Sequence, residues 1–216
     1  MHIRVNRLVS IILVALSPLT YANTSSPIQL APPDVSGGRS LMQALKDRQS
    51  TKAYRQQPIS HVVLSELLWA AFGINRPESG KRTAPSAMNS QEMDIYVVFQ
   101  QGTYRYEAKE HRLLPVCTQD VRKLVATQTY AQVAPINLVY IADYARLSPR
   151  VEEQKKPIYA AFHAGAIAQN VHLYCASVGL GAVVRDGIDR KALHKAFALR
   201  PDQAIVMGQT VGYPEE

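Results

Sequence analysis

The stretch IYAAFHAGAIAQNVHLYCASV, residues 158–178, predicts the long central helix of this chain. It is apolar on nearly every face, which is typical of a helix buried in a core. Gly165 inside it costs about 1 kcal/mol of helix stability relative to alanine. Together with the alanines at 160, 161, 164 and 168, this glycine predicts close packing against another helix. Gly179 follows directly and is typical of a helix end.

Shorter helices and strands are expected before and after this helix in the sequence. Apolar runs and alternating patterns predict strands at 94–99, 103–106, 136–142, 182–185 and 204–207. Helical patterns cover 120–130 and 190–198. Ser40 and Ser60 are typical N-caps, and they predict helices that run to about Arg48 and to Gly73. Residues 75–93 are expected to form a loop that enters a helical turn. Helices and strands alternate without a regular period.

The first 22 residues have the pattern of a secretory signal peptide. Arg4 and Arg7 precede a mostly apolar run, Ala22 offers a small residue for cleavage, and the run is too short to span a bilayer. A retained membrane anchor is the alternative interpretation. We therefore expect a periplasmic or secreted protein with a signal peptide at 1–22, a flexible lead-in at 23–39 and one domain at 40–216.

Charge and cysteine content narrow the class of protein. The formal net charge of +7 becomes +5 without Arg4 and Arg7, since the first 22 residues contain no acid. The basic residues are scattered rather than gathered in the stripe of a nucleic-acid binder, which favours a positive site for an anionic cofactor. An oxidising compartment permits a bridge between Cys117 and Cys175. The apolar helix around Cys175 instead favours a buried thiol.

A first polar cluster follows the first predicted helix. It consists of Arg48-Gln49-Ser50-Thr51-Lys52. Because Arg48 and Lys52 are four residues apart, they share a side of the chain in both a helix and a strand. Two cations can thus converge on one phosphate, with the arginine binding as a fork and the lysine as a point charge. The alternative is a plain helix end whose cations satisfy the dipole.

Two further clusters have the composition of a cofactor site. In Pro85-Ser86-Ala87-x-Asn89-x-Gln91 the proline fixes a loop, the hydroxyl and amide supply hydrogen bonds, and the small Ala87 lets a planar ring approach. An ordinary helix entry capped by Ser86 is the alternative. Leu180 and Gly181 follow the central helix, where a plain glycine stop is the alternative. Arg185, four residues later, is a candidate phosphate contact or a solvent-facing residue.

Other chemistries have little support. The chain has no Gly-x-Gly-x-x-Gly fingerprint, phosphate loop, Gly-x-Ser-x-Gly elbow or Cys-x-x-Cys pair. His163 and His172 are nine residues apart and point to opposite sides of the helix, so they do not form a metal pair. His163, Asn170 and Ser177 share one face at seven-residue spacing. We interpret this stripe as hydrogen-bonded core groups rather than an inter-helix seam.

With these motifs in hand, the chain resembles the nitroreductase family over nearly all of 40–214. Residues 44–54 and 85–91 are similar to the family's two flavin-contacting motifs. The segments 68–76 and 168–170 are closer to the branch of azoline-oxidising dehydrogenases. The resemblance implies an α+β fold, with a mixed sheet flanked by helices, and a homodimer that binds FMN at its interface. It implies that Arg48, Gln49, Ser50 and Lys52 contact the phosphate and ribityl chain of FMN. The contacts from the partner subunit would come from Pro85, Ser86, Ala87 and Asn89. Leu180 and Gly181 would lie near the flavin ring.

The departures from the family concern the ends of the site. Many members carry Lys-x-Arg after the last strand, whereas this sequence reads Tyr213-Pro214-Glu215-Glu216, and Arg185 is the candidate substitute. Glu92-Met93 stands where many members have Pro-Trp. The implied function is an FMN oxidoreductase that takes electrons from a donor such as NAD(P)H and passes them to a small nitroaromatic- or quinone-like substrate. A peptide- or metabolite-modifying flavin dehydrogenase and a flavin- or ligand-binding protein without turnover are the alternatives.

Overall fold

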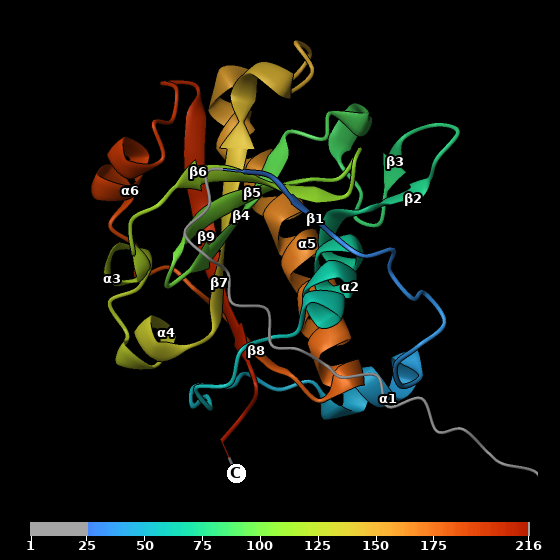
Figure 1. Ribbon diagram of the computed structural model, residues 1–216. Coiled ribbons are helices and arrows are strands. Elements are labelled where there is room, and N and C mark those ends of the chain that lie inside the picture. Colours follow the sequence, from blue (N-terminus) through green and yellow to red (C-terminus); the bar gives the residue numbers. More distant parts are fainter. Residues whose placement is uncertain (1–25, 216) are drawn as a thin grey trace, which may run out of the picture.

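The computed structural model describes residues 26–215, and the expected signal peptide at 1–22 lies outside them. A seven-stranded sheet with the order β1-β6-β5-β4-β7-β9-β8 forms the centre of the molecule (Figure 1). Its strands are β1 Ile28–Gln29, β4 Met93–Phe99, β5 Gly102–Glu107, β6 Arg112–Cys117, β7 Ile136–Asp143, β8 Gly181–Arg185 and β9 Gln203–Gly212. Every strand pair is antiparallel. The resemblance implies a mixed sheet. Within residues 26–215, the parallel pairing is limited to one isolated bridge, between Ser50 and Ala182.

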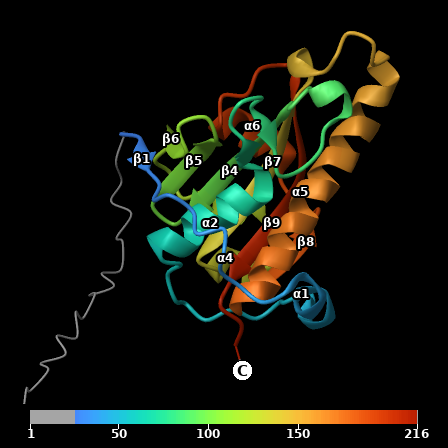
Figure 2. The same ribbon diagram turned by 90° about the vertical axis from the view of Figure 1, so that its right-hand side faces the viewer.

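Helices cover both faces of this sheet. They are α1 Leu41–Asp47, α2 His61–Phe72, α3 Arg122–Val125, α4 Thr129–Val133, α5 Lys156–Val178 and α6 Arg190–Ala196. On one face α2 and α5 bury the larger apolar core, and α5 runs along the sheet with α1 at its C-terminal end (Figure 2). On the other face α3 and α6 pack against Val139 and Ile141 in a second core. The α+β class and the long central helix are therefore as predicted.

Local sequence explains where the site-bearing helices begin and end. The Ser40 hydroxyl accepts from the Gln43 amide, and the Ser60 hydroxyl accepts from the Val63 amide, so both predicted N-caps are confirmed. Gly179 ends α5 in the left-handed region with φ +78°. Its neighbour Leu180 donates to the Cys175 carbonyl at 2.8 Å, and this contact reverses the chain directly into β8.

Several sequence predictions differ from the structure. The helix expected at 120–130 is two short helices, since the Thr127 amide donates to the distant Gly187 carbonyl at 3.0 Å. Within the lead-in, which the composition predicts to be mobile or strap-like, residues 28–29 pair with β6 at the sheet edge. A small β2–β3 hairpin (Ile74–Arg76 and Lys81–Arg82) stands inside the expected loop. Within residues 26–215 no helix is long and apolar enough to cross a membrane.

The central helix is less enclosed than its composition predicts. Ala160, Ala164 and Ala168 are buried as expected, but Gly165 is exposed, and a Cβ added there meets no atom within 4 Å. The close packing predicted at this glycine does not occur within one chain. The two cysteines are free, and Cys175 is buried at 1% exposure, as the apolar helix predicted.

Candidate flavin site

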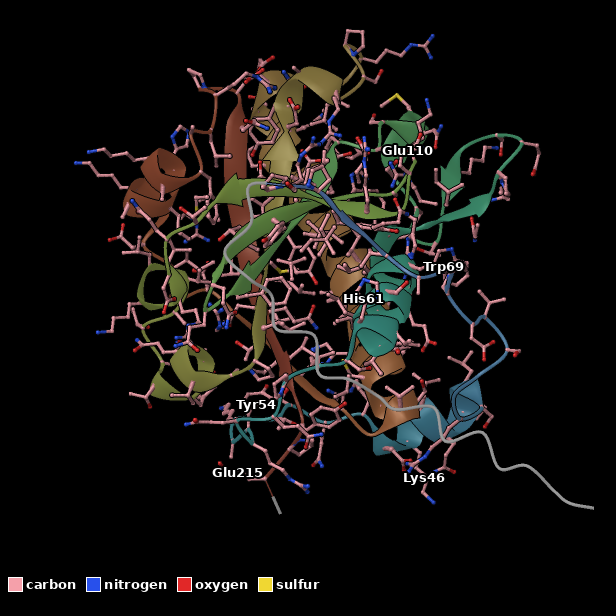
Figure 3. The ribbon with its side chains drawn as sticks, viewed as in Figure 1. Lys46, Tyr54, His61, Trp69, Glu110 and Glu215 are labelled. Atoms are coloured by element: carbon pink, nitrogen blue, oxygen red, sulfur yellow. The ribbon has the colours of Figure 1, made fainter. Side chains whose placement is uncertain are left out.

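The first and third predicted motifs lie against each other. Ser50 bridges Ala182, and the Thr51 amide donates to the Ala182 carbonyl at 3.1 Å. A Cβ added to Gly181 lies only 2.5 Å from Thr51 Oγ1, so this position requires glycine. Lys46 and Tyr54, which flank the motif, lie at the same end of the molecule as Glu215 (Figure 3). The loop after α1 therefore runs beside the start of β8, because its backbone pairs with that strand.

This end of the molecule offers positive charge beside a cavity of about 210 Å³. Among residues 26–215, neither Arg48 nor Lys52 has an acidic side chain in ion-pair contact, whereas the nearby Asp47 is already bound by Arg39 at 2.8 Å. The pKa of His172, which lines the cavity, lies below its usual range because of burial first and the Arg48 charge second. Two uncommitted cations and the Ser50 hydroxyl make a suitable place for an anion.

The second motif forms a strained loop. Ala87–Asn89 is a short 3-10 turn, and Met88, Asn89 and Gln91 have φ of +52°, +52° and +47°. Such values are costly for residues other than glycine and persist only where the surroundings fix them. Two contacts within the segment do so: Ser86 Oγ accepts from the Gln91 amide at 3.0 Å, and Arg82 Nε donates to Gln91 Oε1 at 2.8 Å.

A buried pair between the central helix and the residue before β4 completes this support. The Ala87 amide donates to His163 Nε2 at 2.9 Å, and His163 Nδ1 contacts Glu92 Oε1. His163 is buried and Glu92 has no exposed surface. In the stripe of His163, Asn170 and Ser177 the three side chains bond to separate partners, and among them Asn170 reaches another helix, at the Ala71 carbonyl of α2. Glu92, noted above as a departure from the family, has a clear partner.

The two halves of the predicted site are far apart in one chain. Ala87 is attached to α5 at His163, whereas Leu180 and the first motif lie beyond its end at Gly179. Sixteen residues of helix separate these points, which is about 24 Å at a rise of 1.5 Å per residue. One chain therefore does not bring the second motif to the cavity that the first and third motifs share.

Arg185 belongs to the sheet core rather than to this cavity. Its guanidinium donates to Thr210 Oγ1 at 2.9 Å, to Asn137 Oδ1 at 2.6 Å and to the Val125 carbonyl. Burial lowers its pKa to about 10. Since these acceptors engage the guanidinium on the inner side of the sheet, the structure gives no support to Arg185 as a phosphate contact.

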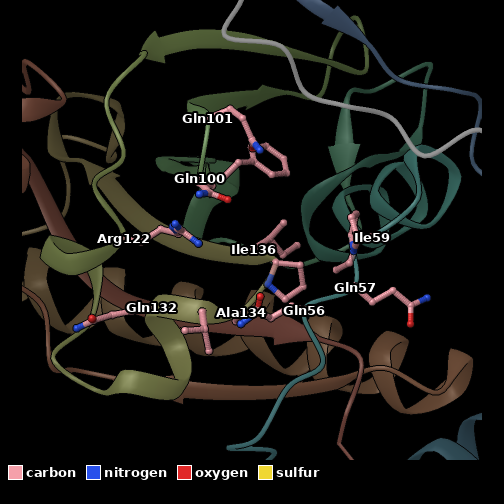
Figure 4. A pocket seen from close by; sticks show the side chains of 13 residues that line it. Gln56, Gln57, Ile59, Gln100, Gln101, Arg122, Gln132, Ala134 and Ile136 are labelled. Atoms are coloured by element: carbon pink, nitrogen blue, oxygen red, sulfur yellow. The ribbon is translucent and has the colours of Figure 1, made fainter.

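A different cavity of about 400 Å³ is shown in Figure 4, and no residue of the three motifs lines it. Its wall combines glutamine side chains with an apolar base, and it is lined by Gln56, Gln57, Pro58, Ile59, Phe99, Gln100, Gln101, Arg122, Gln132, Val133, Ala134, Pro135 and Ile136. The Arg122 charge is bound by both carboxylate oxygens of Asp120. Among residues 26–215, no three His, Cys, Asp or Glu side chains gather as metal ligands would.

Sequence reasoning missed three residues that shape the site. Thr51 was quoted only as part of its motif, yet its side chain defines the space at Gly181. His172 was considered only as a metal ligand, and Glu92 only as a departure from the family. The one available signal for Glu92 was an acid next to a buried strand, because such carboxylates need a partner.

These features define an α+β flavin-type oxidoreductase fold, and the comparisons with known proteins identify its family. The chain belongs to the nitroreductase family, whose sequence pattern matches residues 45–213. A curated relative from Methanocaldococcus jannaschii is 32% identical over 153 residues, covering 66% of this chain and 76% of the relative. A crystal structure from Ralstonia eutropha JMP134 is 37% identical with a TM-score of 0.85, covering 94% of this chain and 96% of the other. Both bear the name “putative nitroreductase”. The protein is thus a nitroreductase-family oxidoreductase.

Two more distant structures share the fold. The Escherichia coli microcin synthetase McbBCD complex is 18% identical with a TM-score of 0.70, covering 97% of this chain and 85% of the matched chain. A Desulfovibrio desulfuricans protein solved in complex with FMN is 21% identical with a TM-score of 0.60, covering 82% of this chain and 88% of the other. At these identities the likeness concerns the fold alone.

Proposed function

We propose that this protein is an FMN-dependent oxidoreductase of nitroreductase type that acts on a small nitroaromatic- or quinone-like substrate. The observation that carries the proposal is the cavity lined by Gln49, Thr51 and Leu180, beside the close approach of Thr51 to Gly181. Arg48 and Lys52 flank these lining residues in the first motif, and neither has an ion-pair partner among residues 26–215. Arg48, Ser50 and Lys52 suit a phosphate, and a glycine-enforced backbone approach suits a flat ring near Leu180. The FMN-bound relative supports the choice of cofactor.

We propose further that two chains complete each flavin site. The second motif is about 24 Å from the first along α5, so an antiparallel partner is needed to supply Ser86, Ala87 and Asn89. The α1–α5 surface supports such a partner because it exposes large apolar side chains. These are Leu41 at 62%, Met42 at 74%, Ile158 at 51% and Phe162 at 66% exposure. Leu41 and Met42 lie on α1 at the C-terminal end of α5, and Ile158 and Phe162 lie near its N-terminal end, so an antiparallel partner would cover both groups. Gly165, open within one chain, lies on the same helix.

The roles of the residues follow from their chemistry. Arg48 and Lys52 hold the phosphate end, Gln49 and Ser50 bind hydroxyls, and Leu180 excludes water beside the ring. FMN, when held by these residues, would supply the chemistry of hydride and electron transfer between a reduced donor such as NAD(P)H and the second substrate. Among residues 26–215 we assign no side chain as a general acid or base.

Subunit mixing tests the cofactor and the shared site together. One variant carries Arg48→Met, and the other carries Ser86→Ala with Asn89→Ala. Each homodimer is expected to lose FMN on desalting, as judged by its visible absorption. A heterodimer refolded from both contains one wild-type site and is expected to retain half of the wild-type flavin. If wild-type protein binds no FMN, the cofactor proposal fails. If wild-type protein binds FMN but the mixture retains none, the sites are not shared.

Location outside the cytoplasm remains our proposal, on the basis of the signal-like pattern at 1–22. Expression of the full chain in a bacterium followed by N-terminal sequencing of the periplasmic fraction tests it. A mature protein that begins at Asn23 is expected. A full-length chain confined to the cytoplasm would contradict export.

A further inference from the structure

The loop that carries the second flavin motif needs an external support. Met88, Asn89 and Gln91 all lie in the left-handed region without being glycine. Each such residue costs of order 1 kcal/mol or more unless contacts over-determine it. Ser86 and Arg82 tie Gln91, Arg82 also donates to the Phe72 carbonyl of α2, and Ser90 Oγ accepts from the Ser148 amide, but none of these contacts engages the Ala87 N–H.

One side chain outside the loop holds the backbone of its motif. The Ala87 amide donates to His163 Nε2 at 2.9 Å across 76 residues of sequence. A ring nitrogen that accepts from an amide carries no proton, so the proton of neutral His163 lies on Nδ1. That nitrogen faces Glu92 Oε1, and the carboxylate therefore accepts from it.

Glu92 makes this choice of tautomer secure. Its side chain has no exposed surface, and its Oε2 has no hydrogen-bond partner among residues 26–215. A buried carboxylate so poorly satisfied gains more from the His163 N–H than a solvated one would. The opposite tautomer would place an Nε2–H against the Ala87 N–H and leave Glu92 Oε1 facing a bare ring nitrogen. The pair thus presents Nε2 as an acceptor.

We propose that His163 and Glu92 are positioning residues for the flavin, through a fixed tautomer that anchors Ala87 and orients the loop of residues 86–91. This inference rests on the proposed function, because the loop is there taken to meet the flavin of the partner subunit. Neither residue contacts the cofactor itself in this scheme. Among residues 26–215, this is the contact that ties the Ala87 amide to α5.

Two substitutions of similar size separate the two contacts of His163. In His163→Gln the side-chain amide oxygen reaches the Nε2 position and still accepts from Ala87, but the Nδ1 donor to Glu92 is gone. In His163→Asn the amide nitrogen occupies the Nδ1 position and still donates to Glu92, but the acceptor for Ala87 is gone. Each variant therefore serves as the control for the other.

The two variants are expected to differ in which property they lose, FMN affinity in one and thermal stability in the other. The FMN dissociation constant of the Asn variant is expected to rise at least tenfold, on the order of one lost hydrogen bond and its consequences. The Gln variant is expected to stay within about threefold of wild type in FMN affinity but to melt lower, because Glu92 loses its donor. If His163 had only a structural role, the FMN affinity and the melting temperature would fall together in both variants.

Two measurements on flavin-free protein make the inference independent of turnover. Nitrogen-15 chemical shifts of the His163 ring are expected to show the Nδ1–H tautomer in wild type. Hydrogen exchange of the Ala87 amide is expected to be faster in the Asn variant and near wild type in the Gln variant. An Nε2–H tautomer, or wild-type FMN affinity in the Asn variant, overturns the inference. A wild-type protein that binds no FMN refutes the proposed function instead, and the tautomer and exchange results then show whether the anchor itself exists.

Discussion

Replacing Arg185 with methionine separates a structural arginine from a phosphate ligand. The guanidinium makes three hydrogen bonds inside the sheet core, to Thr210, Asn137 and the Val125 carbonyl. Bonds to a charged group contribute about 1.5–3 kcal/mol each, which gives roughly 4.5–9 kcal/mol in total. Burial lowers the pKa of Arg185 from 12.5 to about 10, and that desolvation opposes folding by about 3 kcal/mol.

The hydrogen-bond contribution minus the desolvation cost is about 2–6 kcal/mol. The free energy of unfolding is expected to fall by this amount in Arg185→Met. For a domain of this size that corresponds to a fall in melting temperature of about 4–24 °C. Because Arg185 is directed into the core, FMN affinity measured well below the melting temperature is expected to stay within about threefold of wild type. Urea unfolding and flavin fluorescence titration measure the two quantities on the same preparation.

Arg48→Met is the matched control and is expected to show the opposite pattern. Arg48 has no ion-pair partner among residues 26–215, so its removal changes melting by little, while the loss of a charged phosphate contact weakens FMN binding about 10- to 100-fold. If Arg185→Met retains wild-type stability and loses FMN, the assignment of Arg185 to the core is wrong and it is a phosphate ligand after all.

Three further predictions concern other parts of the molecule. Gly181→Ala places a Cβ 2.5 Å from Thr51 Oγ1, so FMN affinity by titration is expected to fall at least tenfold, and an unchanged affinity would contradict the close-approach argument. Phe162→Glu puts a charge on the proposed dimer face and is expected to yield monomers without flavin in sedimentation velocity, whereas a flavin-loaded monomer would refute the shared site. Burial lowers the pKa of His111 below 6.5, so its protonation favours the unfolded chain and stability is lost as pH falls below about 6.5. His111→Asn, which tolerates the φ of +46°, is expected to flatten the fall in melting temperature between about pH 7 and 5, and an unchanged slope would exclude His111 as its source.

The elements with strong local patterns could be predicted, because their causes are local. Two serine caps, the apolar run at 136–142 and the Gly179 stop each appear in the structure close to their expected positions. Strand β6 escaped prediction because it contains Pro115 and is partly exposed, and β1 has only two residues. The predicted helix at 120–130 breaks where the hydrogen bond that the Thr127 amide donates to the Gly187 carbonyl overrides local propensity. Such long-range contacts cannot be recognised from a short stretch of sequence.

The motifs of the candidate site could be found in the sequence, but their arrangement in space could not. Backbone pairing with β8 joins the first and third motifs, and both were recognised from residue type and spacing. The support of the second motif depends on His163 and Glu92, which are 71 residues apart and meet only in the fold. Composition also failed to distinguish the two kinds of apolar surface on α5. The pattern around Gly165 is the same for a helix buried in a core and for one that awaits a partner.

The two halves of the proposed flavin site are attached to α5 in different ways. The first half is fixed by β8, which leaves α5 at Gly179, whereas the second half is fixed by a side chain at His163. One residue inserted between these points would rotate one end by about 100° relative to the other and shift it by about 1.5 Å. A partner aligned on one half-site would then miss the other. The length of α5, more than any single contact, therefore determines whether two chains of this protein form a complete site.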